Sequence, residues 1–453
     1  MARTKATAKK AVGLLTSARH NDLDDGHAVP AEISDVNMDD APPAPQSIEA
    51  DDGGEAWHEI YCYMCHNGGD MLICDWCLRA MCSECLNKID ITKVPQKWDF
   101  KCPTCYYKDW KDKDKYYAFQ LNGERVMDEP TIISGGLVGP QHAHVNTRHL
   151  AIVVFRLKSL ERKGSIPELL KAHLESWFWQ TNTLHYYDIP FDLQDLQDAD
   201  RHAQRVRAVI DKLIDVECRR VVTFVYTHSN ILRGDLYHAW DATSSIDKFF
   251  FRVLTPPYLE YTKQYGETSH WMFILACGAI ITSPKALDTL DNELLKHRVP
   301  FCIGFTASSL NAHLAADFII AFGSRVLIER ARLTSKTLRK LLQLSWSLRR
   351  HGSIVLFRLC DNEAGMRWIA REEYVWHHRK LAPAGHPTPL QCPECKHLHT
   401  LKTFYTDAHA GYVCMMKDCS FEAEWEVDYD AEAELDAYDG GWRMRPLSVA
   451  HLL

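Results

Sequence analysis

The sequence predicts a multidomain α/β protein in which small cysteine-rich modules flank a larger sheet domain. Half of the sixteen cysteines lie within residues 62–105, and four more lie within residues 392–419. Between these regions, apolar runs of strand length alternate with segments of helical spacing, which is typical of a mainly parallel sheet with helices on both faces. Residues 1–56 lack such a pattern, and we expect them to be disordered.

The first module contains four C-x2-C pairs. In such a pair a tight turn directs two thiolates at one tetrahedral ion, with Zn–S distances of about 2.3 Å. Four pairs therefore supply the ligands of two zinc ions. Disulfides would require an oxidising compartment, and the basic, polar N-terminus has no apolar segment typical of a secretory signal, so we favour zinc. We expect metal binding to supply the folding energy of so short a segment. The pairs are Cys62 and Cys65, Cys74 and Cys77, Cys82 and Cys85, and Cys102 and Cys105.

The gaps between these cysteines are 2, 8, 2, 4, 2, 16 and 2 residues, an order that resembles a PHD-type finger, which is a cross-braced chromatin reader. Residues 68–75, GGDMLICD, resemble the core of those fingers, and residues 57–110 would form the module. The fifth ligand is usually histidine and is Cys82 here, as in the all-cysteine ADD-type relatives. A RING finger has the same brace and is the alternative. The resemblance implies one ion shared by Cys62, Cys65, Cys82 and Cys85, and a second shared by Cys74, Cys77, Cys102 and Cys105.

PHD-type fingers bind the free N-terminus of a histone tail that begins Ala-Arg-Thr-Lys, and the peptide adds a strand to the finger. Acidic residues beside that strand can pair with arginine or unmodified lysine, although solvated turn residues are the alternative. An aromatic cage for methylated lysine is also conceivable from Trp57, Tyr61, Tyr63 and Trp76, with ordinary packing as its alternative. The implied peptide contacts are Asp70, Met71, Leu72, Ile73, Asp75, Pro95 and Gln96.

The chain itself opens with MARTKATAKKAVG, which without Met1 resembles the tail of the third core histone. We therefore expect the arm to be an internal ligand of its own finger; a generic basic arm and binding in trans to other readers are the alternatives. Residues 20–56 carry eleven Asp or Glu and no Lys or Arg, and they form the linker. About 48 residues lie between residues 1–13 and Cys62, and a flexible linker of that length spans about 38 Å, which gives an effective concentration on the order of 0.1–1 mM. The mimic residues are Ala2, Arg3, Thr4 and Lys5.

The middle domain, residues 146–380, contains the βα alternation. A histidine follows one expected strand and a cysteine follows the next, and functional groups of such sheets lie at the carboxyl ends of strands. The expected strands are 150–157, 184–189, 221–226, 271–276, 300–305 and 354–359, and the expected helices are 167–179, 199–216, 310–327 and 335–349.

The two residues at these strand ends are His228 and Cys277. This arrangement resembles the caspase-like fold, and FILAC at 273–277 and ADFIIAF at 316–322 resemble its CHAT branch. The resemblance implies that His228 deprotonates Cys277 and that the thiolate attacks a peptide carbonyl. An inactive scaffold is the alternative, since the His-Gly of the family is His228-Ser229 here.

The C-terminal region, residues 388–430, resembles a small β zinc ribbon that holds a third ion. An acidic tail, residues 431–453, would follow. The net charge of −8 argues against direct nucleic-acid binding, and the longest apolar run, 271–281, is too short to span a membrane. We expect a nuclear chromatin reader fused to a caspase/CHAT-like domain, with a chromatin-directed cysteine peptidase or a non-catalytic adaptor as the alternatives. The expected ligands of the third ion are Cys392, Cys395, Cys414 and Cys419.

Overall fold

The computed structural model of the protein has a multidomain α/β fold with two compact units, residues 1–136 and 137–453. It describes residues 61–77, 79–109, 115–134, 145–179, 181–264, 269–362, 365–406, 409–426 and 440–447. The histone-like arm with Ala2, Arg3, Thr4 and Lys5, the acidic linker and Trp57 lie outside these residues. Among the described helices, none has the length and apolar character needed to cross a bilayer.

The first unit consists of short strands and turns around a small core. The first unit extends beyond residue 110, at which the sequence predicted that the finger ends. Phe119 is buried against Phe100 and Trp98, and its ring centroid lies 5.8 and 5.9 Å from theirs. Two antiparallel sheets form, one from β1 and β2 and one from β3, β4 and β5. The elements are β1 (Met71–Ile73), β2 (Ala80–Cys82), η1 (Glu84–Leu86), η2 (Ile91–Lys93), β3 (Asp99–Phe100), α1 (Pro103–Asp109), β4 (Phe119–Leu121) and β5 (Glu124–Arg125).

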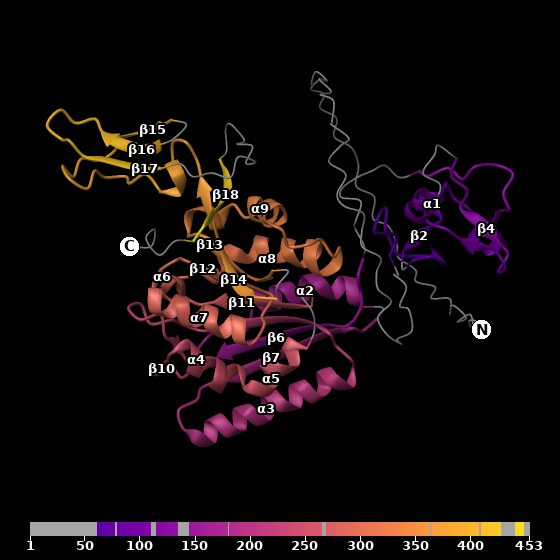
Figure 1. Ribbon diagram of the computed structural model, residues 1–453, viewed down its shortest axis with the longest axis horizontal. Coiled ribbons are helices and arrows are strands. Elements are labelled where there is room, and N and C mark those ends of the chain that lie inside the picture. The colour runs from indigo at the N-terminus through magenta and orange to yellow at the C-terminus, as the bar shows by residue number, and fades with distance from the viewer. Residues whose placement is uncertain are drawn as a thin grey trace. The chain divides into compact units, whose positions relative to one another are not determined.

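The second unit is organised around one eight-stranded sheet (Figure 1). Its strand order is β18-β14-β13-β12-β11-β8-β6-β7, and the five strands from β12 to β7 are parallel, whereas β13, β14 and β18 are antiparallel. The parallel part therefore has the order 2-1-3-4-5 of a doubly wound fold, whose ligand crevice lies at the carboxyl ends of the strands. The strands are β6 (Leu150–Leu157), β7 (Leu184–Phe191), β8 (Arg220–Tyr226), β11 (His270–Leu275), β12 (Phe301–Phe305), β13 (Ile354–Asp361), β14 (Arg367–His377) and β18 (Gly441–Pro446).

Helices cover both faces of this sheet, as predicted (Figure 1). The face that carries α2, α8 and α9 is packed with aromatic rings, including Phe224 stacked on Phe273 at 5.1 Å. The face that carries α3, α4, α5 and α7 holds a continuous aliphatic and aromatic core. The main helices are α2 (Ile166–Phe178), α3 (Leu196–Asp215), α4 (Ile246–Phe249), α5 (Pro256–Lys263), α6 (Ala279–Thr282), α7 (Pro284–Lys296), α8 (Ala316–Phe322) and α9 (Ser335–Gln343).

One long helix predicted over residues 310–327 is divided into three pieces. A 3-10 turn η4 (Ala312–Ala315) precedes α8, and a π-helix η5 (Gly323–Ile328) follows it. Gly323 lies against α2, where a Cβ atom would come within 2.7 Å of the Leu170 side chain. The last predicted helix likewise ends at Gln343, and a separate 3-10 turn η6 (Ser347–Arg350) follows.

The C-terminal segment also differs from its prediction. Residues 440–447, which belong to the predicted acidic tail, include β18, which pairs with β14 at the edge of the large sheet. Glu373 and Arg445 lie opposite each other in this pair and form an ion pair of 2.7 Å, so the buried carboxylate is neutralised. The ribbon region lies between these two strands in sequence and forms its own three-stranded sheet from β15 (Leu401–Tyr405), β16 (His409–Cys414) and β17 (Glu422–Glu426).

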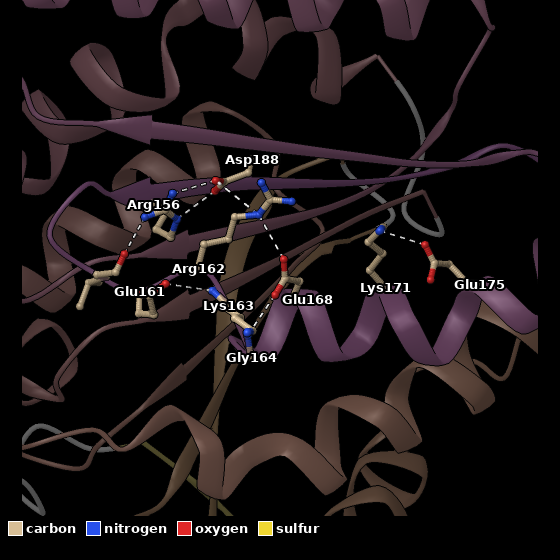
Figure 2. A network of polar contacts seen from close by, with 10 residues as sticks. Arg156, Glu161, Arg162, Lys163, Gly164, Glu168, Lys171, Glu175 and Asp188 are labelled. Carbon is tan, nitrogen blue, oxygen red and sulfur yellow. Dashed lines mark hydrogen bonds and ion pairs between the residues drawn. The ribbon is translucent and has the colours of Figure 1, made fainter.

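A polar network occupies the carboxyl ends of β6 and β7 (Figure 2). Arg156 makes two hydrogen bonds to the carboxylate of Asp188, at 3.0 and 2.8 Å, and donates a third to the carbonyl of Leu160. Both side chains of the ion pair are about nine-tenths buried. In contrast, the pair between Lys171 and Glu175 on α2 is solvent-exposed.

The buried pair should contribute much more to stability than the exposed one. Because Asp188→Asn leaves the Arg156 guanidinium buried without its counter-charge, we expect a loss of about 3 kcal/mol in the free energy of unfolding. Glu175→Gln, the matched control, should cost at most about 0.5 kcal/mol. Urea unfolding followed by tryptophan fluorescence measures both, and equal midpoints for the two variants would contradict the prediction.

Candidate functional site

Twelve cysteines are gathered in three groups of four, and within each group all sulfur atoms lie within 4.8 Å of one another. Sulfur pairs from different knuckles are 3.6–3.7 Å apart. A tetrahedral zinc with bonds of about 2.3 Å places its sulfur ligands about 3.8 Å apart, so the donor sets fit zinc. All of these thiols are free of disulfides. The groups are Cys62, Cys65, Cys82 and Cys85; Cys74, Cys77, Cys102 and Cys105; and Cys392, Cys395, Cys414 and Cys419.

The first two groups interleave along the chain, which is the cross-brace that we expected. Donors surround the sulfur atoms of the second group. The Arg79 guanidinium lies 3.5 Å from Cys77 Sγ, and the backbone N–H of Cys102 donates to Cys74 Sγ at 3.3 Å. Such outer contacts favour the thiolate form that metal binding requires.

The expected peptide-binding strand of the finger is β1. Within the described residues it pairs with β2 alone, so its other edge is open for strand addition. Asp70 is exposed beside this strand, and Ile73 is 38% exposed. Asp75 instead accepts a hydrogen bond of 2.7 Å from the backbone N–H of Phe100, which joins it to β3.

The remaining expected contacts of the finger have partners within the unit. The carbonyl of Pro95 accepts the backbone N–H of Trp98 at 3.0 Å, and Gln96 lies on the surface of the same turn. Tyr61 is buried, the Tyr63 ring lies under Arg79, and the Trp76 ring lies 4.4 Å from the ammonium of Lys101. Two of the four cage aromatics therefore already face cations of the chain.

A second candidate centre lies at the carboxyl edge of the large sheet. The parallel strands β8 and β11 end in register, with Tyr226 opposite Leu275. The pairing continues one step further, since the backbone N–H of Thr227 donates to the carbonyl of Leu275 at 3.2 Å. The next residues outward are His228 and Cys277, so the two strands bring the predicted pair together.

The surroundings of Cys277 favour its ionised form. A hydrogen bond to the His228 side chain is the main influence that lowers the pKa of the thiol; burial acts in the opposite direction, and the backbone N–H groups of Leu310 and Ser229 lower the pKa further. Cys277 is half-buried and His228 is exposed. A thiol with a lowered pKa, beside a base and accessible from solvent, is the environment of a nucleophilic cysteine.

The turn after Cys277 is held by very close backbone packing. The N–H of Gly278 donates to the carbonyl of Ala307 at 2.6 Å, and the hydroxyl of Ser229 donates to the carbonyl of Cys277 at 2.8 Å. A Cβ atom on Gly278 would lie 2.1 Å from the carbonyl oxygen of Thr306, so only glycine fits there. Ser229, which follows His228, thus supports the backbone of Cys277.

The sequence did not predict that the backbone N–H of Leu310 lowers the pKa of Cys277. This N–H carries no residue-type signature, and the segment was predicted to begin a helix. The residues that follow the end of β12 instead form a loop, 306–311, before η4 begins at Ala312.

No known family model matches the chain. An ABC transporter substrate-binding protein from Sphaerobacter thermophilus aligns with 49% of the chain at 11% identity and a TM-score of 0.16. The alignment spans 58% of the length of that protein. A similarity at this TM-score carries no argument about fold or function.

The three cysteine groups predict three zinc ions per chain. Cys74→Ser removes one ligand of the second group and should reduce the zinc content from three to two, because a site of three thiolates loses most of its affinity. Cys360→Ser, which changes a thiol outside the groups, should retain all three. Metal analysis of the purified chains tests this prediction, and a wild-type chain with fewer than three ions would contradict it.

Proposed function

We propose that the second unit is a cysteine peptidase of the caspase/CHAT type and that the zinc finger directs it to chromatin. The observation that supports catalysis is the position of His228 and Cys277 at the matched ends of adjacent parallel strands, where His228 and the backbone N–H groups of Leu310 and Ser229 lower the pKa of the Cys277 thiol. Parallel strand ends are where doubly wound sheets carry their chemistry.

The proposed reaction begins when His228 accepts the thiol proton of Cys277. The thiolate forms a bond to the carbonyl carbon of a peptide, and the carbonyl electrons move to its oxygen. The N–H groups of Ser229 and Leu310 lie beside that developing charge and stabilise it. The tetrahedral intermediate then collapses: the C–N bond breaks, and the leaving amine takes the proton from His228. Water attacks the thioester through the same base, which releases the acid and restores the thiol.

Substitution of the nucleophile should abolish this activity. Cys277→Ala removes the attacking atom, so we expect cleavage to fall by on the order of 10³-fold or more, and His228→Gln should have a comparable effect. Cys360→Ser, the matched control, should cleave as the wild type does. The measurement is mass spectrometry of products from a proteome-derived peptide mixture and from a peptide of residues 2–20.

A wild-type chain that cleaves neither substrate, or cleavage that survives in Cys277→Ala, would exclude the peptidase. The domain would then be a non-catalytic scaffold, and the chain an adaptor that presents a histone-like tail.

A second candidate function belongs to the finger, which would read the N-terminus of a histone tail or of the chain itself. Two observations support this proposal: within the part of the chain that the structure describes, β1 pairs only with β2, and the carboxylate of Asp70 is exposed. The peptide would add a strand to β1, and its basic side chains would pair with Asp70. Under both proposals the protein acts in the nucleus.

Self-binding predicts competition between the arm and added peptide. A chain without residues 2–19 should bind a peptide of residues 2–10 about 10-fold more tightly than the full chain does, because the tethered arm is present at an effective concentration on the order of 0.1–1 mM. Acetylation of the peptide amine, or Asp70→Asn, should weaken binding. Fluorescence anisotropy measures each affinity.

Recognition of a peptide N-terminus and self-occupation by the arm are tested independently. Equal binding of the free and acetylated peptides would exclude reading of an N-terminus. Equal affinity of the full and shortened chains would exclude self-occupation alone, and the finger would then bind its ligand in trans.

A further inference from the structure

The loop that donates to Cys277, residues 306–311, is attached to the sheet domain at two places. Its base is fixed by the turn before β13, where the N–H of Thr306 donates to the carbonyl of Ser353 at 3.0 Å and the N–H of Ser353 donates to the Thr306 hydroxyl at 2.8 Å. Gly352 packs against the same base, since a Cβ atom there would lie 2.9 Å from the nitrogen of Ala307. The base also accepts the N–H of Gly278, so it is anchored beside the nucleophile.

The far end of the loop is fixed by a side chain. The backbone N–H of Asn311 donates to Nε2 of His351 at 2.8 Å. Asn311 directly follows Leu310, whose backbone N–H is one of the groups that lower the pKa of the Cys277 thiol. Asn311 also begins η4, where its side-chain oxygen accepts the N–H of His313 at 3.2 Å. The contact with His351 therefore joins the start of η4, and the Leu310 peptide before it, to the turn that anchors the base.

We propose that His351 is a positioning residue for Cys277, which acts by holding the Leu310 N–H against the thiol. This inference rests on the proposed peptidase only for its effect on turnover, because the reactivity of the thiol is measurable without a substrate. Nε2 accepts a hydrogen bond only in the neutral imidazole, and burial lowers the pKa of His351, which favours that form at neutral pH. Hydrogen bonds hold the loop on both sides of Leu310: the N–H of Gly278, the residue after Cys277, donates to the Ala307 carbonyl, and the N–H of Asn311 donates to His351 Nε2.

The specific requirement of this proposal is a hydrogen-bond acceptor at position 351. His351→Leu fills a similar volume but removes the acceptor, whereas His351→Gln retains one. Without the acceptor the Leu310 N–H is no longer held at the thiol, so the thiolate loses a charge-assisted hydrogen bond and the pKa of Cys277 rises. His313→Gln is the matched control, because the hydrogen bond of His313 to Asn311 comes from its backbone N–H and its side chain is exposed.

The experiment measures the rate at which iodoacetamide alkylates Cys277 in the full chain between pH 5 and pH 9. The tryptic peptide of residues 264–285 contains no other cysteine and reports the reaction by mass spectrometry. Only the thiolate reacts, so we expect His351→Leu to slow alkylation at pH 7 about 5-fold and to shift its pH profile upward. His351→Gln and His313→Gln should stay within about 2-fold of the wild type.

Turnover supplies an independent readout. With any peptide that the wild type cleaves, His351→Leu should lower kcat about 10-fold with little change in KM, because the displaced N–H acts on the developing oxyanion. Gly352→Ala displaces the same loop from its base and should also slow alkylation, which keeps the proposal testable if His351→Leu fails to fold.

Unchanged alkylation in His351→Leu would overturn the positioning role, and so would equal loss in His351→Leu and His351→Gln, which indicates packing alone. A chain that cleaves no peptide but shows slower alkylation in His351→Leu and recovery in His351→Gln would overturn the peptidase and retain the positioning role.

Discussion

The pairing of β8 with β11 is the constraint on which the candidate catalytic centre depends. Both strands lie in the middle of the sheet and are buried between helices on two faces, so a shift of one residue would move every side chain into the closely packed core on the opposite face. Their register ends with Tyr226 opposite Leu275. This register fixes the separation of His228 and Cys277, and neither residue needs a dedicated scaffold of its own.

The two units obtain their stability from different sources. The sheet domain has a continuous apolar core that folding alone can bury. The first unit has a small core to which six buried cysteines and the partly buried Cys77 contribute. Eight cysteines of this unit are ligand candidates, so we expect its fold to depend on metal. Chelation should therefore separate the two units functionally, since loss of zinc removes the structured face of the finger and leaves the strands that carry His228 and Cys277 in place.

How well the sequence predicted each element depended on the signal that the element carries. Continuous apolar runs identified β6, β8 and β11 almost to the residue, because central strands are buried on both faces. The strand β14 was missed, because its charged residues, such as Arg371 and Glu373, are neutralised by partners far away in sequence. The candidate site was predicted in part for the same reason. The strand ends identified His228 and Cys277. Leu310 contributes only a backbone group, and His351 acts through a loop forty residues away in sequence, so neither carries a signal in the sequence.

The position of the ribbon in the sequence has a consequence for the sheet. Residues 378–440, which include the ribbon, separate β14 from β18, although these strands are hydrogen-bonded neighbours. Pairing of β18 must close this long segment, and the entropic cost of closure grows with the length of free chain. A metal ion bound by Cys392 and Cys419 would shorten that free chain. Metal binding by the ribbon would then be thermodynamically linked to the pairing of β18 with β14.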